Sequence, residues 1–412
     1  MADCGQGRCR GLIIFTIFIE KEMAAMKKIR NSLFVLLTAL TVTLSGCGGG
    51  GGGGTPTAAD LDGDGVPNAQ DAFPNDPAKF ASFAQPQELS GLTGSVFSTA
   101  VSINSNRQVV GMSDNGSQEM RAVLWNVASN GTPSAPAELN PIAGNTYSAA
   151  YAINDSGVAV GESSKAAAYV AVLWPAGTQT PTELPLGALT APSAAYGINN
   201  GGRIVGEATT GGNTVPVFWS SSATAAVPLP LLSGGTTGTA YFIDSTGTKI
   251  VGESANSSGK MRAVLWTINS SGTVGTPTDL GVLSGHDRSV AFGINGSGYI
   301  VGESESATGE VHAVLWTEGI LGGLFGYRVT DLGAPGNGGS AAAINDLGFI
   351  AGWSNVSGSL ASLWHAMNAL DISPAVSNQI FATTGFTQAY GINNAGIVVG
   401  LSVDRAFVAM PQ

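Results

Sequence analysis

The sequence predicts an all-β fold, a seven-bladed β-propeller of four-stranded blades, on two observations. One motif returns seven times between residues 95 and 410, and each copy contains up to four short apolar runs separated by turn residues. Repeats of about 40–50 residues with four strands each are typical of propeller blades. The motif is marked by an Ile-Asn or Ile-Asp step, whose polar residues are Asn104, Asn154, Asn199, Asp244, Asn295, Asn345 and Asn393.

The first two runs of each copy indicate a hairpin. In the second copy they flank the turn Asn154-Asp155-Ser156-Gly157. The Asn side chain can accept from a backbone N–H two residues on, and Gly takes the left-handed conformation that closes the turn. Six copies keep this Gly, whereas the first has Arg107 there, and we expect neighbouring Asn106 to carry the strain.

The third run of six copies ends in Trp, and a weaker fourth run follows, such as Glu183 to Leu186. Because the Trp recurs in register with core positions, we expect it to pack inside the blade rather than to form a sugar-binding platform. These residues are Trp125, Trp174, Trp219, Trp266, Trp316 and Trp364.

The two ends of the repeat region predict how the ring closes. The last copy stops after its third run, Phe407 to Met410, and two residues follow. An unassigned run, Gln87 to Leu92, precedes the first copy. Since an open array would expose unpaired strand edges, we expect residues 87 to 92 to complete the last blade.

The repeat follows the pattern S-x-A-x-x-I-N-x-x-G-x-I-V-G-E-S and then H/R-A-V/F-L-W, which resembles the bacterial extracellular HAF repeat, named for its His-Ala-Phe step. That step here reads Arg121-Ala122-Val123, Arg262-Ala263-Val264, His312-Ala313-Val314 and Arg405-Ala406-Phe407. The resemblance implies a secreted, propeller-like fold over residues 85–412. It implies no particular chemistry.

The N-terminal segment reads as an export signal. Basic residues precede the apolar run Leu33 to Leu44, which is too short to span a bilayer and suits a signal peptide over residues 26–46. Met26 is then a candidate start, which would make residues 1–25 a mistaken upstream extension.

The signal ends in Leu44-Ser45-Gly46-Cys47, which resembles a bacterial lipobox. The resemblance implies that Cys47 is lipidated and becomes the first mature residue, so that the membrane is a partner through a lipid anchor. Gly48 after the Cys favours the outer membrane or cell surface. A chance small-residue cleavage site is the alternative. Residues 47–59 then form a lipidated Cys and a flexible Gly-rich linker.

Residues 60–77 contain the sharpest chemical motif. Oxygen-bearing residues stand at positions 1, 3, 5, 9 and 12 of residues 60–71, with Gly65 at position 6, which is the spacing of a calcium loop. Because its carboxylates would repel one another without a cation, we predict Ca²⁺ as the cofactor; a solvated acidic linker is the alternative. The predicted metal ligands are Asp60, Asp62, Asp64, Val66 through its carbonyl, Asn68 and Asp71.

The continuation through Phe73-Pro74-Asn75-Asp76-Pro77 resembles a thrombospondin type 3 repeat. An EF-hand is less consistent with the sequence, because a Gly tract stands where its entering helix would be. The family usually has several such repeats and this chain has one, so a second, shared ion is not implied.

The amino-acid composition indicates a class of protein and excludes one kind of binding partner. The chain has 43% hydrophobic and 11% charged residues, as expected of a folded β-rich body. Removing residues 1–46 leaves 11 basic and 25 acidic residues, a net charge of −14, so no nucleic acid partner is expected. Cys4 and Cys9 lie upstream of Met26, so the mature chain would have no disulfide. We expect a monomer.

Candidate chemistry within the repeats is sparse. His286, His312 and His365 have no metal-ligand spacing, so we expect no zinc site, and His286-Asp287 reads as a solvated loop pair. A Gly-Glu step recurs in four copies, which would place a candidate acidic ring on the propeller, able to bind cations or basic partners. Solvated strand ends are the favoured interpretation of these residues, Glu162, Glu207, Glu253 and Glu303.

Three functions fit these observations. The first and favoured one is a lipid-anchored, calcium-binding surface protein whose non-catalytic propeller binds an unknown protein or glycan, for adhesion or as a structural module. The second is a hydrolase or lyase that acts on an extracellular polymer with carboxylates at the propeller mouth. The third is a scaffold subunit of a cell-envelope complex. No catalytic residue is assigned.

Overall fold

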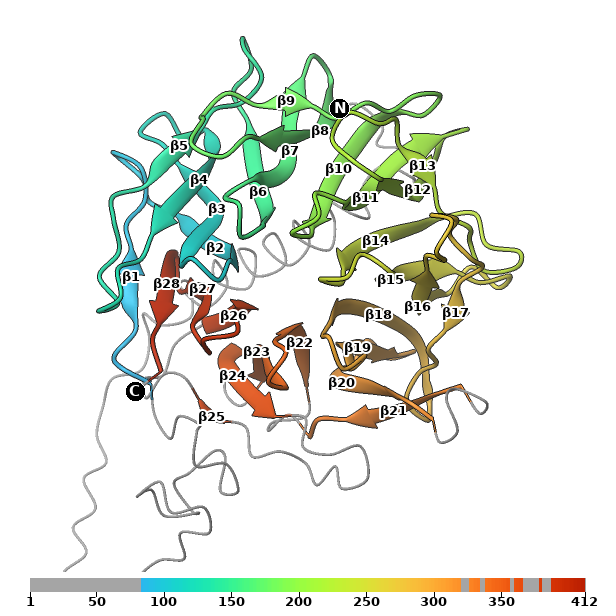
Figure 1. Ribbon diagram of the computed structural model, residues 1–412. Helices are drawn as coiled ribbons and strands as arrows, with labels where there is room; N and C mark the ends of the chain where they lie inside the picture. The colour runs from blue at the N-terminus through green and yellow to red at the C-terminus, as the bar shows by residue number, and fades with distance from the viewer. Residues whose placement is uncertain are drawn as a thin grey trace, which may run out of the picture.

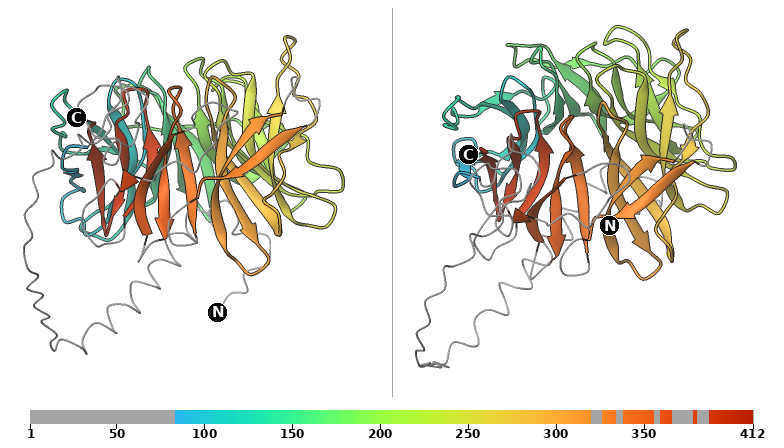
Figure 2. Two further views of the ribbon diagram at one scale, coloured as in Figure 1. Left: turned by 90° about the horizontal axis from the view of Figure 1, so that it is seen from below. Right: turned by 60° about the horizontal axis from the view of Figure 1, so that its bottom comes forward.

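The computed structural model describes residues 83–319, 326–333, 338–355, 359–365, 378–379 and 387–411. These residues form seven four-stranded antiparallel sheets and no helix. The sheets stand as blades around a central axis (Figure 1), and two further views show neighbouring blades side by side around the ring (Figure 2). The predicted seven-bladed β-propeller is therefore confirmed.

The strands follow the chain order, with the innermost strand first in each blade. Blade 1 contains β2 (Ser98–Ile103), β3 (Gln108–Asp114), β4 (Met120–Asn126) and β5 (Ala137–Leu139). Blade 2 contains β6 (Ser148–Ile153), β7 (Ala159–Lys165), β8 (Ala168–Trp174) and β9 (Thr182–Glu183). Blade 3 contains β10 (Thr190–Ile198), β11 (Ile204–Thr210), β12 (Asn213–Trp219) and β13 (Val227–Pro228). Blade 4 contains β14 (Gly238–Ile243), β15 (Lys249–Ala255), β16 (Met261–Thr267) and β17 (Thr278–Asp279).

Blade 5 contains β18 (His286–Ile294), β19 (Ile300–Ser306), β20 (Val311–Glu318) and β21 (Tyr327–Asp331). Blade 6 contains β22 (Gly339–Ile344), β23 (Phe349–Asn355), β24 (Ser359–His365) and β25 (Asn378–Gln379). Blade 7 contains β26 (Thr387–Ile392), β27 (Val398–Ser402), β28 (Arg405–Ala409) and, as its outer strand, β1 (Gln87–Leu89).

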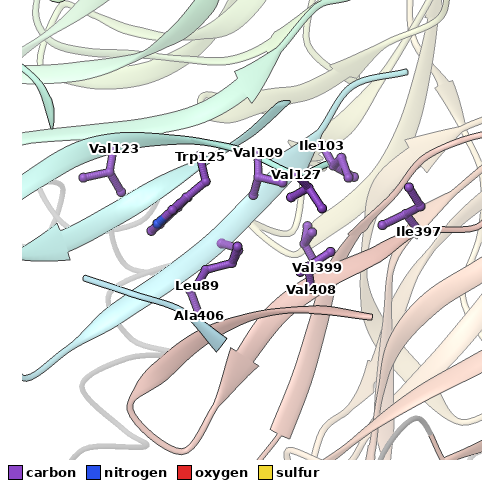
Figure 3. Close-up of a cluster of buried hydrophobic side chains, with 11 residues drawn as sticks. Leu89, Ile103, Val109, Val123, Trp125, Val127, Ile397, Val399, Ala406 and Val408 are labelled. Atoms are coloured by element: carbon purple, nitrogen blue, oxygen red, sulfur yellow. The ribbon is translucent and has the colours of Figure 1, made fainter. Parts of the chain in front are cut away.

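The N-terminal strand closes the ring as predicted. β1 pairs antiparallel with β28, with Gln87 opposite Val408 and Leu89 opposite Ala406. Leu89 is fully buried and packs with Trp125 and Val408 in a core between blades 7 and 1 (Figure 3). Pairing between the two ends of the folded region covers the edge of β28 and gives the last blade the four strands of the other blades.

The blade tryptophans are structural, as expected. All six are buried at the ends of the third strands. The indole N–H of Trp125 donates to the carbonyl of Ser90 at 2.8 Å, and that of Trp174 donates to the carbonyl of Asn140 at 2.9 Å. Each of these bonds ties a third strand to the residue that follows the outer strand of the preceding blade, so these two Trp side chains satisfy their polar atom while filling the core. The indole nitrogen of Trp364 has no hydrogen-bond partner among the described residues.

Two positions of the repeat motif have a direct explanation in contacts between blades. The Ser or Thr that opens an inner strand accepts a hydrogen bond from the backbone N–H of the Ala in the third strand of the preceding blade. For example, Ala122 N–H donates to Ser148 Oγ at 2.9 Å, and Ala406 N–H donates to Ser98 Oγ at 3.0 Å. The recurring Ser and the Ala of the His-Ala-Phe step are thus two halves of one contact.

The recurring Gly of the second strand is required by close backbone packing. Each inner strand bulges beside this Gly, as between Ala195 and Gly197 in β10. A Cβ on Gly206 would lie 2.0 Å from the carbonyl oxygen of Ala194. Only Gly therefore allows the two strands to approach this closely.

One turn prediction is wrong. In the first copy the left-handed conformation is taken by Arg107 itself, with φ at 60°, and not absorbed by Asn106. The six Gly at this position have φ between 72° and 88°. The turn geometry is therefore fixed by the hairpin, and Arg107 accepts the strained conformation where Gly is missing.

Candidate functional site: the central cavity

The inner strands enclose a cavity of about 370 Å³ on the propeller axis. Its lining comes from the inner strands of all seven blades and from the turns that follow them. This volume lies in the range of about 300–1,000 Å³ that is typical of small-molecule sites. We call it the central cavity.

Aromatic side chains line one side of the central cavity in four consecutive blades. Tyr151, Tyr196, Tyr241 and Phe292 occupy equivalent positions of β6, β10, β14 and β18. Successive ring centroids lie 5.2, 5.6 and 5.6 Å apart, at tilted or edge-on angles. We call these four residues the aromatic arc. Tyr390 and Trp353 add aromatic surface from blades 7 and 6.

The Asn residues of the Ile-Asn steps form a ring of hydrogen bonds around the cavity, which we call the amide ring. Each side-chain amide donates to the backbone carbonyl of the equivalent residue in the next blade, at 2.9 to 3.2 Å. These donors are Asn104, Asn154, Asn199, Asn295, Asn345 and Asn393. Asp244 has no amide to donate, so the ring is interrupted between blades 4 and 5.

Two carboxylates lie among the lining residues, on blades 2 and 6. Asp155 accepts from the backbone N–H of Ser105 at 2.8 Å and from the amide of Asn200 at 2.7 Å. Burial acts to raise the pKa of Asp155, but these hydrogen bonds outweigh it and the pKa lies below its ordinary value. Asp346 repeats the arrangement with Gly296 and Asn394. Among the described lining residues none is Lys, Arg or His.

A second layer of carboxylates lies behind the aromatic arc. Tyr151 donates its hydroxyl to Glu162 at 2.9 Å, Tyr196 to Glu207 at 3.1 Å, and Tyr241 to Glu253 at 3.1 Å. Tyr147 also donates to Glu162, and Thr239 of the next blade donates to Glu207.

The structure corrects the expectation of solvated strand ends for these residues. Glu162, Glu207 and Glu253 are 3%, 9% and 3% exposed and lie where neighbouring blades meet. Burial raises their pKa values to about 7, about 6 and about 7, despite the hydroxyl donors that act in the opposite direction. Sequence alone could not distinguish a strand end in solvent from one covered by the next blade.

Glu303 is the fourth member of this layer and differs from the others. Its arc partner is Phe292, which has no hydroxyl, and its Oε2 atom is buried without a hydrogen-bond partner among the described residues. Burial raises its pKa to about 7, although hydrogen bonding from Ser340 acts to lower it. The equivalent positions in blades 1, 6 and 7 hold Met112, Trp353 and Leu401. Acidic and aromatic residues thus coincide in blades 2 to 5.

The histidines have surroundings that the sequence did not indicate. His286 begins β18 instead of lying in a solvated loop, and its ring meets that of His312 edge-on, with centroids 5.1 Å apart. Burial acts to lower the pKa of His312, but Asp331 at 2.6 Å and Glu310 at 3.2 Å raise it overall. Asp287 pairs with Lys260 of blade 4 at 2.7 Å. Within the described ranges no three His, Cys, Asp or Glu residues gather as a metal site. The side chain of His365 is outside the described part.

The predicted lipidation and calcium sites lie outside the described residues. These are Cys47, Asp60, Asp62, Asp64, Val66, Asn68 and Asp71. The part of the chain that is described contains no helix with the length and apolar character needed to cross a bilayer.

No family model matches the sequence, and no curated protein matches it. Among solved structures, a prolyl endopeptidase is similar at 12% identity and a TM-score of 0.52, over 77% of this chain and 48% of that one. TolB from Acinetobacter baumannii is similar at 14% identity and 0.38, over 56% and 53%. The lectin BP39L from Burkholderia pseudomallei is similar at 12% identity and 0.46, over 79% and 99%. The chain thus spans about half of the endopeptidase and of TolB. The likeness to the endopeptidase shows the propeller fold alone.

Sequence reasoning missed the aromatic arc, although a signal for it exists. An aromatic residue stands three positions before the Asn or Asp of the Ile-Asn step in five of the seven copies. The fifth is Tyr390, whose hydroxyl donates to Gln388. Aligning the copies against a closed ring would have placed all five on the axis.

Proposed function

We propose that this protein is a non-catalytic binding module whose central cavity takes a small ligand, or a protruding group of a larger one. The observation that carries the proposal is the cavity itself, which combines ligand-sized volume, aromatic walls and a polar mouth of Asn and Asp side chains. Such a combination of apolar walls with few oriented polar groups is typical of binding sites.

The arrangement of carboxylates favours binding over hydrolysis. A propeller-mouth hydrolase or lyase would need carboxyl groups that reach the substrate. Three glutamates instead lie behind tyrosine rings and accept hydrogen bonds from the tyrosine hydroxyls. They are Glu162, Glu207 and Glu253. The lining carboxylates Asp155 and Asp346 are held by backbone N–H groups and Asn amides of neighbouring turns.

In the same proposal, the propeller is exported and tethered to the outer membrane or cell surface by lipid on Cys47, and the Ca²⁺ loop of residues 60–77 stiffens the stalk. The sequence patterns support this part of the account. Loss of radiolabelled fatty acid from a Cys47→Ser variant would support the anchor, and unchanged labelling would exclude lipidation at that residue.

A thermal-shift screen of metabolites and glycans against the purified protein tests the binding function. Val101 lines the cavity at the blade 1 position equivalent to the aromatic arc, so Val101→Trp should fill the cavity. Val96→Trp is the matched control, because Val96 is 64% exposed. We expect ligands that stabilise the parent and the control but not Val101→Trp, and that are recovered unchanged. Stabilisation that survives in Val101→Trp, or turnover of the ligand, would contradict the proposal.

A further inference from the structure

We propose that the central cavity selects a small organic cation of the alkylammonium class, free or as the end of a larger molecule. This inference rests on the binding function proposed above and names its ligand chemistry. Three features of the cavity carry it: the aromatic walls, the sign of the surrounding charge, and the absence of a basic residue from the described lining.

The aromatic walls provide the attraction. Tyr151, Tyr196, Tyr241 and Phe292 surround one side of a common space, with neighbouring centroids within 5.6 Å of each other. The negative faces of aromatic rings attract a cation within about 6 Å, most strongly where water is excluded. An alkylammonium group also has an apolar surface, which suits a cavity whose remaining walls include Ile153 and Ile294.

The charged side chains that line the cavity are negative, and further carboxyl groups lie behind its aromatic walls. Asp155 and Asp346 belong to its lining from blades 2 and 6. Behind the aromatic arc, the hydroxyls of Tyr196 and Tyr241 donate to Glu207 and Glu253, and the hydroxyl of Thr239 also donates to Glu207. In blade 5, Glu303 lies on the strand beside that of Phe292, and its Oε2 atom is buried without a hydrogen-bond partner in the described part of the chain. A cation in the cavity would compensate the charge of Asp155 and Asp346, whereas an anion would be repelled.

Two basic residues of the turns after the inner strands donate to backbone carbonyls, and Arg288 acts electrostatically on Glu253 and Glu303 of the second layer. Arg107 donates to the carbonyl of Val127 at 3.2 Å, and Arg203 donates to the carbonyl of Gly247 at 2.6 Å. Neither residue is among those that line the cavity. A bare divalent metal is a poorer fit, because walls of aromatic and aliphatic side chains cannot replace its hydration shell.

Isothermal titration with choline and with 3,3-dimethylbutan-1-ol tests the inference directly. The two probes have the same shape, but the second has carbon in place of the charged nitrogen. We expect choline to bind about tenfold or more tightly than its neutral counterpart, from the size of a desolvated cation–π interaction. Equal binding of both probes would overturn the inference and leave an apolar binding cavity. Binding of neither would overturn it as well, and the binding function would then be decided by the library screen with Val101→Trp.

Two pairs of variants test whether the preference for choline over the neutral probe arises in the central cavity. Tyr196→Leu removes one aromatic wall, and Tyr327→Leu makes the same change in the outer strand β21. Asp155→Asn removes a lining charge, and Asp279→Asn removes one on the exposed strand β17. Each cavity variant should weaken choline binding about tenfold with little effect on the neutral probe, and each control should leave both unchanged. Choline binding that is insensitive to both cavity variants would place the cation outside the cavity and overturn the inference.

Discussion

The side-chain amide of Asn393 donates to the backbone carbonyl of Asn104 at 3.1 Å, across 289 residues of sequence. This bond joins the last blade to the first and belongs to the ring of Asn amides around the cavity. Two interactions therefore close the propeller: this hydrogen bond, and the pairing of the outer strand β1 with β28. The hydrogen bond joins blades 7 and 1 near the axis, and the strand pairing completes blade 7 at its outer side.

The interruption of the amide ring at Asp244 gives a first prediction. Asp244 is buried, and its Oδ1 atom accepts from the backbone N–H groups of Thr248 and Lys249, which an Asn oxygen can replace. Its Oδ2 atom accepts from the hydroxyl of Thr246, which can instead accept from an Asn amide. Asp244→Asn adds the missing donor toward the carbonyl of Asn295 in blade 5. We expect a gain of about 0.5–1.5 kcal/mol in the free energy of unfolding, measured by urea denaturation.

The reciprocal change is the control. Asn199→Asp removes an amide that donates to the carbonyl of Asp244 at 3.2 Å, and it should lower stability by a similar amount. If both variants shift stability in the same direction, the amide ring is not what holds the inner edges of the blades together.

A second prediction concerns the Gly of the second strand. Gly206→Ala would place a Cβ 2.0 Å from the carbonyl oxygen of Ala194, and backbone atoms cannot move aside cheaply. We expect a loss of about 2 kcal/mol or more in the free energy of unfolding. Gly116→Ala is the matched control, because its nearest neighbour is 3.5 Å away. A Gly206→Ala protein as stable as this control would refute the close-packing explanation.

The buried carboxylates predict how stability depends on pH. Burial raises the pKa of Glu253 to about 7 in the folded protein, above its ordinary value of 4.5. The folded state therefore holds this proton more tightly than the unfolded state, and stability should fall as pH rises from about 4.5 to about 7. The groups that act on Glu253 are Tyr241, Arg288, Glu207 and Glu303.

Glu253→Gln isolates this effect, because Gln is uncharged at every pH and can still accept from Tyr241. The variant should be more stable than the parent at pH 8, on the order of 1–3 kcal/mol, and nearly equal to it at pH 5. Thermal unfolding across this pH range provides the measurement. Glu183→Gln, on the exposed strand β9, should follow the parent. A stability difference that does not change with pH would mean that Glu253 is not protonated in this window.

The calcium loop gives a fourth prediction, for the full chain. Ca²⁺ should bind weakly, with a dissociation constant on the order of 10⁻⁴–10⁻³ M, because we expect a loop beside a Gly-rich linker to spend part of its binding energy on ordering itself. Removing Ca²⁺ should increase proteolysis between Cys47 and Phe80 and leave the propeller intact. Calorimetry is the measurement, with the double variant Asp62→Ala, Asp64→Ala as the control. Equal heats from the parent and this variant would reject the site.

The fold could be predicted from the sequence because residues that make the structural contacts recur in every copy of the repeat. The Ile-Asn step marks each inner turn, the Trp marks each third strand, and the run at Gln87 revealed the missing outer strand. The central cavity was harder to predict, since its walls come from residues about 45 to 51 positions apart that meet only when the ring closes. The environment of Glu162 and its equivalents depends on the neighbouring blade, which local pattern does not show.

The most direct test of the binding account is the fluorescence of Trp353. The chain has seven tryptophans, of which six are buried at the ends of third strands and Trp353 lines the central cavity. A ligand from the screen should change the fluorescence of the parent protein saturably, and Trp353→Phe should abolish the change while the protein stays folded. A saturable change that persists in Trp353→Phe would show that the ligand binds outside the cavity and would contradict the central claim.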